Sequence, residues 1–207
     1  MITYKKVISI SAILLILSIG LLKWTYSADV YSVTDDCINC ITSQETSNKS
    51  VTEYLLNKEN KRKKELTDYI VKYHKTDLKL AKRIVELAHK YQKEVFPRAE
   101  NILAIAAIES NFDPYAVSHL KKDPAMGLMQ IRLITWKHLI NKNQYTIENQ
   151  IRFGSEILSL LYKELNDKEA AIAAYNVGLT AYNKGIINQR YIENYRKTIE
   201  KFKINTV

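Results

Sequence analysis

Apolar residues recur at helical spacing along most of the chain after residue 65, and this pattern predicts a series of helices. One helix begins after Asp77, a good N-cap residue, and another runs from about Thr146 to Leu165. A third begins near Asp167 and ends near Gly178. A last helix carries one apolar stripe of Ile192, Tyr195, Ile199 and Phe202. Long alternating stretches do not occur, so we predict a mainly α fold.

The segment AIAAIESNF, residues 104–112, is apolar at nearly every position before Glu109. Such a segment is typical of a helix that is buried on all sides. A carboxylate at its end must be ion-paired, protonated or functional, because an unpaired buried charge is costly. Residues 111–125 contain Pro114 and Pro124 and predict a loop, with at most a short hairpin between Tyr115 and Ile131.

The N-terminus has the pattern of an export signal. Lys5 and Lys6 precede the apolar run VISISAILLILSIGLL, Val7 to Leu22. Residues 1–28 are either a cleaved signal peptide or a membrane anchor, in which Trp24 and Tyr26 extend the apolar segment across residues 7–26. Both alternatives place the remaining chain in the periplasm or the cell envelope.

Residues 29–65 predict a polar and charged linker before a catalytic domain at residues 66–207. Within it, residues 41–52 are polar and lack helical periodicity, and residues 57–65 form a charge run. Cys37 and Cys40 form a CxxC pair, which we interpret as a local disulfide or two free thiols without a catalytic role.

Composition narrows the classes of function. The 207-residue chain has 46% hydrophobic residues and a net charge of +9, which suits a globular protein with an anionic partner or simply a soluble surface. Its five glycines are isolated, so a phosphate-binding loop is excluded, and its four histidines show no HExxH spacing. Aromatic residues do not interleave with the basic run, so we predict no nucleic-acid partner.

Three short blocks carry the chemistry: Glu109–Ser110, then GLMQ at residues 127–130, then AYNVG at residues 174–178. AVS at residues 116–118 and AMG at residues 125–127 lie between the first two. In this order and spacing, the blocks resemble the lytic transglycosylases of the Slt type, which are related to goose-type lysozyme. The resemblance extends from about Leu80 to Phe202.

The resemblance implies a lysozyme-like α+β fold that cleaves the β-1,4 bond between N-acetylmuramic acid and N-acetylglucosamine in peptidoglycan. It makes Glu109 the catalytic acid, and it implies no metal or cofactor. It further implies substrate-binding or supporting roles for other residues of the three blocks, with Met129 as a sugar contact. These residues are Ser110, Met129, Gln130, Tyr175 and Asn176. Small exported members of the family often serve secretion or conjugation assemblies, which are further candidate partners.

Two positions depart from the family pattern. Gln150 occupies a place before Ile151 where family members often have Asn. The segment LTAYNKGIINQRY, residues 179–191, replaces a glycine-rich stretch that many members have after the third block. The second departure lies where the outer part of the cleft is expected.

A general acid must be protonated near neutral pH, and an apolar pocket raises the pKa of a glutamate toward that range. Ile105, Ala106 and Ile108 predict such a pocket around Glu109. A second carboxylate would favour a muramidase that uses water. The candidates are Asp113, which is expected to cap a turn, and Asp123, which is expected to be solvated. The alternatives to a transglycosylase are therefore a muramidase of the same fold and a weakly active wall-binding component of an envelope machine.

Overall fold

The computed structural model describes residues 30–140 and 145–204, with side chains from residue 50. The chain divides into two compact units, residues 1–57 and 58–207. The predicted export segment at residues 1–28 lies outside the described residues. Within the described part, no helix combines the length and the apolar character needed to cross a membrane.

Helix α2, Val30–His74, includes residues of both units. It includes residues 41–52, whose helical structure the sequence pattern did not predict. The linking role of this region stays a prediction. In the second unit the helix packs onto the domain through Leu66 and Ile70, which are 1% and 0% exposed. Arg62 also fastens α2, because it donates to Glu100 at 3.0 Å and to the Phe202 carbonyl at 2.7 Å.

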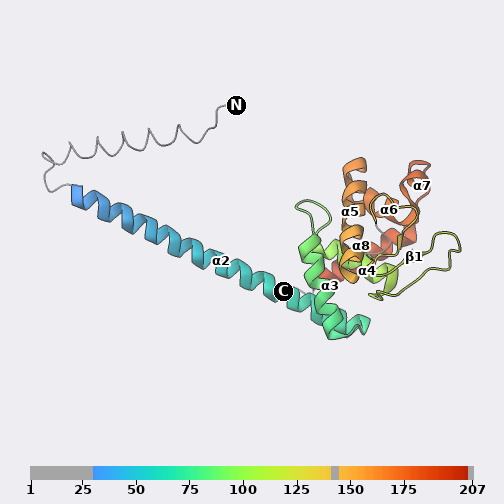
Figure 1. The fold of residues 1–207 in the computed structure, drawn as a ribbon, viewed down its shortest axis with the longest axis horizontal. Helices are drawn as coiled ribbons and strands as arrows, with labels where there is room; N and C mark the ends of the chain where they lie inside the picture. Colours follow the sequence, from blue (N-terminus) through green and yellow to red (C-terminus); the bar gives the residue numbers. More distant parts are fainter. Residues whose placement is uncertain (1–29, 141–144, 205–207) are drawn as a thin grey trace, which may run out of the picture. The chain divides into compact units, whose positions relative to one another are not determined.

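Figure 1 shows the other described helices, and all of them except α7 lie close to their predicted positions. Their bounds are α3, Leu78–Tyr91; α4, Ala99–Ser110; α5, Ile147–Leu165; α6, Lys168–Val177; α7, Leu179–Asn183; and α8, Gln189–Ile204. The side chains of Asp77, Thr146 and Asp167 accept backbone N–H groups at the starts of α3, α5 and α6. This confirms Asp77 as the predicted N-cap and confirms the predicted helix starts near Thr146 and Asp167. The short α7 was not predicted.

Helix α4 is the centre of the core, and α3, α5 and α8 pack against it (Figure 1). Its residues 102–106 have no exposed surface. This confirms the prediction of a helix that is buried on all sides for these residues, whereas Ala107 and Ile108 of the same run are half-buried. Because α4 is held rigidly by its neighbours, the side chains at its C-terminal end have fixed positions.

The loop after α4 carries the predicted hairpin. Strand β1, Ala125–Met126, pairs antiparallel with β2, Ile131–Arg132, and an isolated bridge joins Val117 to Met126. Gly127 lies in the turn between them with φ of 72°, where a side chain is disfavoured. A Cβ atom there would also lie 2.4 Å from the Gln150 side-chain oxygen. The described residues thus form a mainly α fold with one small two-stranded sheet, as predicted.

Candidate active site

Glu109 lies in the last turn of α4, next to residues without solvent exposure such as Ile105 and Ala106. Burial raises the pKa of Glu109 from 4.5 to about 7. Among the described residues, no Lys, Arg or His forms an ion pair with it. The structural alternative of an ion-paired glutamate is therefore not supported, and Glu109 is poised to exchange a proton near neutral pH.

Tyr191 is the direct partner of Glu109, and sequence reasoning missed it. Its hydroxyl donates to Glu109 Oε1 at 2.6 Å from the first turn of α8. This hydrogen bond stabilises the carboxylate and so opposes the effect of burial on the pKa of Glu109. Tyr191 is 7% exposed, and burial keeps its own pKa well above 10. A signal existed, because Tyr191 immediately precedes Ile192 and lies four residues before Tyr195 of the predicted stripe.

Ser110 and Tyr175 connect the two apolar helices to the GLMQ turn. The Ser110 hydroxyl donates to the Leu128 carbonyl at 2.8 Å, and the Tyr175 hydroxyl donates to the Met129 carbonyl at 2.8 Å. The three sequence blocks therefore meet, as the resemblance implied. Met129 itself is 0% exposed, so its side chain does not reach the cleft as a sugar contact in this structure. Its contribution is the carbonyl that holds Tyr175.

Gln130 and Asn176 both line the cleft that contains Glu109. The Gln130 amide donates to the carbonyls of Ala116 and Gly127, each at 3.1 Å, and thereby holds the loop beside the hairpin. Asn176 is exposed and accepts a hydrogen bond from Asn188 at 3.1 Å. Both residues are thus placed to face a bound ligand.

The cleft has a volume of about 790 Å³. It is bounded by the end of α4, the β-hairpin and its following loop, one residue of α5, the end of α6 and the segment around α7. Besides the predicted residues, the cleft is lined by Arg132, Trp136, Lys184 and Ile186, which sequence reasoning did not single out. Glu109 is the only carboxylate among the described residues that line it.

Neither candidate for a second carboxylate lines this cleft. Asp113 is exposed and accepts the Tyr115 backbone N–H at 2.9 Å, which confirms its predicted role in a turn. The prediction that Asp123 is solvated was wrong, because this side chain is 7% exposed. Its carboxylate accepts hydrogen bonds from Ile134 and Thr135, and these bonds with nearby Arg132 hold its pKa below the usual range.

Gln150, the first departure from the family pattern, is buried and forms hydrogen bonds to two different loops. It is 4% exposed, its Oε1 accepts the Leu128 N–H at 2.8 Å, and its Nε2 donates to the Pro114 carbonyl at 3.1 Å. One turn further along α5, Gly154 lies so close to Met129 that a Cβ atom would come within 2.1 Å of its sulfur. Helix α5 therefore packs directly against the GLMQ turn and supports it.

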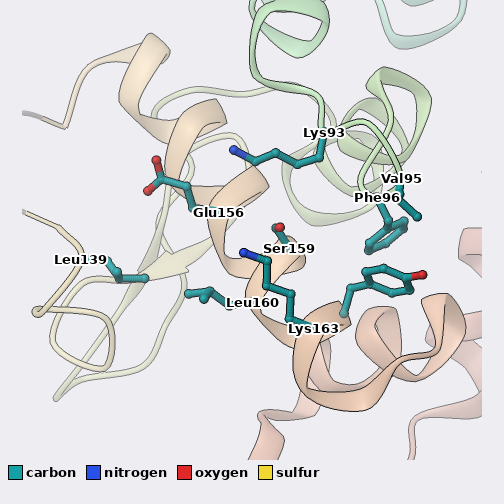
Figure 2. Close-up of a pocket in the computed structure, with 9 residues that line it drawn as sticks. Lys93, Val95, Phe96, Leu139, Glu156, Ser159, Leu160 and Lys163 are labelled. Carbon is teal, nitrogen blue, oxygen red and sulfur yellow. The ribbon is translucent and has the colours of Figure 1, made fainter.

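A second hollow of about 500 Å³ lies on another part of the domain (Figure 2). Figure 2 shows Lys93, Glu156 and Lys163 around an apolar surface that includes Phe96 and Leu160. It shares no residue with the cleft of Glu109. Within the described residues, no group of three or more His, Cys, Asp or Glu side chains is arranged to hold a metal ion.

The fold and the site together describe a helical domain with a cleft whose described lining contains one carboxyl group, that of Glu109. A family model described as the transglycosylase SLT domain matches residues 86–204. The match spans more than half of the chain and all three sequence blocks, and the chain therefore belongs to this family of Slt-type lytic transglycosylases. Membership indicates a peptidoglycan-cleaving activity of this type. No curated protein and no solved structure matches the chain.

Proposed function

We propose that this protein is a lytic transglycosylase that cleaves the bond between N-acetylmuramic acid and N-acetylglucosamine and closes a 1,6-anhydro ring on the muramyl sugar. The observation that carries the proposal is Glu109, the half-buried glutamate that is the one carboxyl group among the described lining residues of the cleft, with a pKa raised to about 7. A group with this pKa serves as acid and as base at neutral pH.

The reaction proceeds in two proton transfers through Glu109. The protonated carboxyl gives its proton to the glycosidic oxygen as the bond to the muramyl C1 breaks, and the substrate's N-acetyl oxygen assists this departure. The resulting Glu109 carboxylate then takes the proton of the muramyl C6 hydroxyl, whose oxygen forms the new bond to C1. Glu109 is protonated again at the end, and no water is consumed.

Two features of the site favour ring closure over hydrolysis. Neither Asp113 nor Asp123 lines the cleft, so the described lining offers no second carboxylate to activate water from the opposite face. The C6 hydroxyl is already part of the bound substrate, and a well-oriented intramolecular nucleophile has effective molarities of up to about 10⁵–10⁸ M.

The test is to incubate the purified full-length chain with peptidoglycan and to measure the masses of the new sugar ends. We expect 1,6-anhydromuramic ends, one water lighter than hydrolysed ends, and their loss in Glu109→Gln by about 10²–10⁴-fold in rate. Reducing muramic ends that depend on Glu109 would instead identify a muramidase. A folded wild-type protein that binds the wall without cleaving it would identify a wall-binding component.

A location outside the cytoplasm belongs to the same proposal, because peptidoglycan lies there. The support is the sequence of Lys5 and Lys6 before the apolar run Val7 to Leu22. The substrate is the glycan strand, and the N-terminal segment connects the protein to the membrane either transiently, as a signal, or permanently, as an anchor.

A further inference from the structure

Two cationic side chains line the cleft around Glu109. Arg132 on β2 and Lys184 directly after α7 both line it, and they are the only Lys or Arg side chains among its described lining residues. Glu109 supplies the one carboxyl group among the described residues of the lining, and burial raises its pKa to about 7. The two cations are therefore not neutralised from within the cleft.

Arg132 is held in place and still has free donors. Its Nε lies 3.3 Å from Asp123 Oδ2, and Asp123 is itself fixed by hydrogen bonds from the chain at Ile134 and Thr135. The two terminal guanidinium nitrogens have no protein partner among the described residues, and the side chain is 51% exposed. A guanidinium oriented in this way presents a planar pair of donors that matches a carboxylate.

Lys184 comes from the segment that replaces the family's glycine-rich stretch. Its backbone N–H closes α7 by donating to the Ala181 carbonyl at 3.1 Å, while its side chain is exposed and has no ion-pair partner among the described residues. The same segment adds Leu179 and Ile186 to the lining. The second departure from the family pattern thus supplies a cation and an apolar wall to the cleft.

We propose that Arg132 and Lys184 form a carboxylate-binding subsite that selects glycan strands bearing anionic substituents on the muramyl sugar. This inference rests on the proposed function, because it concerns the same substrate. The sugar rings of the strand are uncharged, so its negative charges belong to the substituents. The carboxylates come from the stem peptide, or from the lactyl group once the peptide has been removed.

The experiment compares the full-length chain on three soluble substrates: peptide-bearing strands, peptide-free strands with exposed lactyl carboxylates, and peptide-bearing strands whose carboxylates have been coupled to ethanolamine. The variants are Arg132→Gln, Lys184→Gln and Lys184→Arg. Lys197→Gln is the matched control, because it removes the same charge from an exposed position of α8 outside the cleft. The readouts are kcat and KM for release of new sugar ends.

Blocking the carboxylates should raise KM about 3–10-fold for the wild-type chain and for Lys197→Gln, with a smaller change in kcat, as expected for exposed charge-assisted hydrogen bonds. Lys184→Gln and Arg132→Gln should raise KM on the charged strands and reduce the difference between charged and blocked strands. Lys184→Arg should retain that difference. Preference for peptide-bearing over peptide-free strands assigns the recognised carboxylates to the stem peptide, and preference for peptide-free strands assigns recognition to the lactyl carboxylate. Equal use of both strands shows that the subsite accepts either carboxylate.

Wild-type protein that uses charged and blocked strands equally would overturn the inference, as would variants that behave like Lys197→Gln. Because Arg132 contacts Asp123, its variant is accepted only if it unfolds at the wild-type temperature, and Lys184→Gln alone otherwise decides the test. Binding of the same strands by Glu109→Gln separates the two proposals. Carboxylate-dependent binding without cleavage by the wild-type chain would contradict the proposed function alone, and cleavage without any carboxylate preference would contradict this inference alone.

Discussion

Burial and one hydroxyl group shift the pKa of Glu109 in opposite directions. Burial raises the pKa and the hydrogen bond from Tyr191 lowers it. Tyr191→Phe removes that donor, so the pKa of Glu109 should rise further. Because the general acid must be protonated, the loss of activity at high pH should then occur at a higher pH than in the wild-type protein.

The measurement is the pH profile of kcat/KM. Tyr195→Phe is the matched control, because its hydroxyl lies on the same helix but contacts Asn101 at 2.7 Å and not Glu109. We expect the control to keep the wild-type profile. A Tyr191→Phe profile that falls at the wild-type pH would show that this hydroxyl does not set the protonation of the acid.

The same carboxyl group should reduce stability at neutral pH. Its pKa is about 7 in the folded protein and 4.5 in the unfolded reference, so the folded state binds more protons between these pH values. The free energy of unfolding therefore falls as pH rises through this window, by up to about 3 kcal/mol. Glu109→Gln cannot ionise and should unfold at a higher temperature than the wild-type protein at pH 7.5.

Thermal unfolding of both proteins at pH 4.5 and pH 7.5 tests this expectation. His89, whose pKa is lowered chiefly by burial, acts in the opposite direction, since stability is lost as pH falls below its unfolded pKa. It is present in both proteins, so the difference between them isolates Glu109. Equal changes in the two unfolding temperatures would contradict a raised pKa.

The role of Glu109 could be predicted from the sequence, whereas that of its partner Tyr191 could not. Glu109 interrupts an apolar run, so its neighbours along the chain already predict its burial. Tyr191 lies 82 positions away, and only the packing of α8 against α4 brings it to the carboxyl group. Asp123 shows the converse: its sequence neighbours are Lys122 and Pro124, yet the chain at residues 134 and 135 buries it.

At the scale of elements, the sequence predicts what depends on local chemistry. Helix α3 begins at its predicted cap, α5 and α6 begin near their predicted starting residues, and α8 buries Ile192, Ile199 and Phe202 of its predicted stripe. Two elements were missed for physical reasons. Residues 41–52 of α2 have no apolar periodicity, and the five-residue α7 is too short to show one.

Helix α5 holds two loops beside the cleft through the hydrogen bonds of Gln150. This role predicts the effect of replacing that residue. Gln150→Leu has a similar size but leaves the Leu128 N–H and the Pro114 carbonyl without their buried partner. An unsatisfied buried polar group costs about 1–3 kcal/mol, so we expect a loss of about 2–4 kcal/mol in the free energy of unfolding. Activity should also fall, because the Leu128 segment carries the turn that holds Ser110 and Tyr175.

Chemical denaturation and the rate of wall cleavage measure the two effects. Gln189→Leu is the control, because that glutamine is exposed at the start of α8 and should change stability by less than about 0.5 kcal/mol. If Gln150→Leu is as stable and as active as Gln189→Leu, the two hydrogen bonds do not support the turn.

At the scale of the whole molecule, the family match and the compact structural unit do not begin at the same residue. The SLT match covers residues 86–204, and the structure adds residues 58–85 to the same compact unit. The extension is anchored by Arg62, whose partners Glu100 in α4 and Phe202 in α8 the sequence pattern does not reveal. Leu66 and Ile70 of the extension are buried in the core. The blocks predicted the site because they lie at the ends of buried helices. Its outer cations, Arg132 and Lys184, lie on a short strand and after a short helix, where no pattern marked them.

The unit that carries Glu109 should lie on the outer side of the cytoplasmic membrane. We expect Lys5 and Lys6 to remain on the cytoplasmic side when the following apolar run inserts, and the chain after residue 28 to be translocated. Protease added to intact spheroplasts should therefore digest this unit while a cytoplasmic marker protein stays whole. Reversing both charges, Lys5→Glu with Lys6→Glu, should impair export and protect the unit, because the orientation depends on these charges. Protection of the wild-type unit in spheroplasts with intact membranes would place Glu109 away from its proposed substrate and would contradict the predicted export.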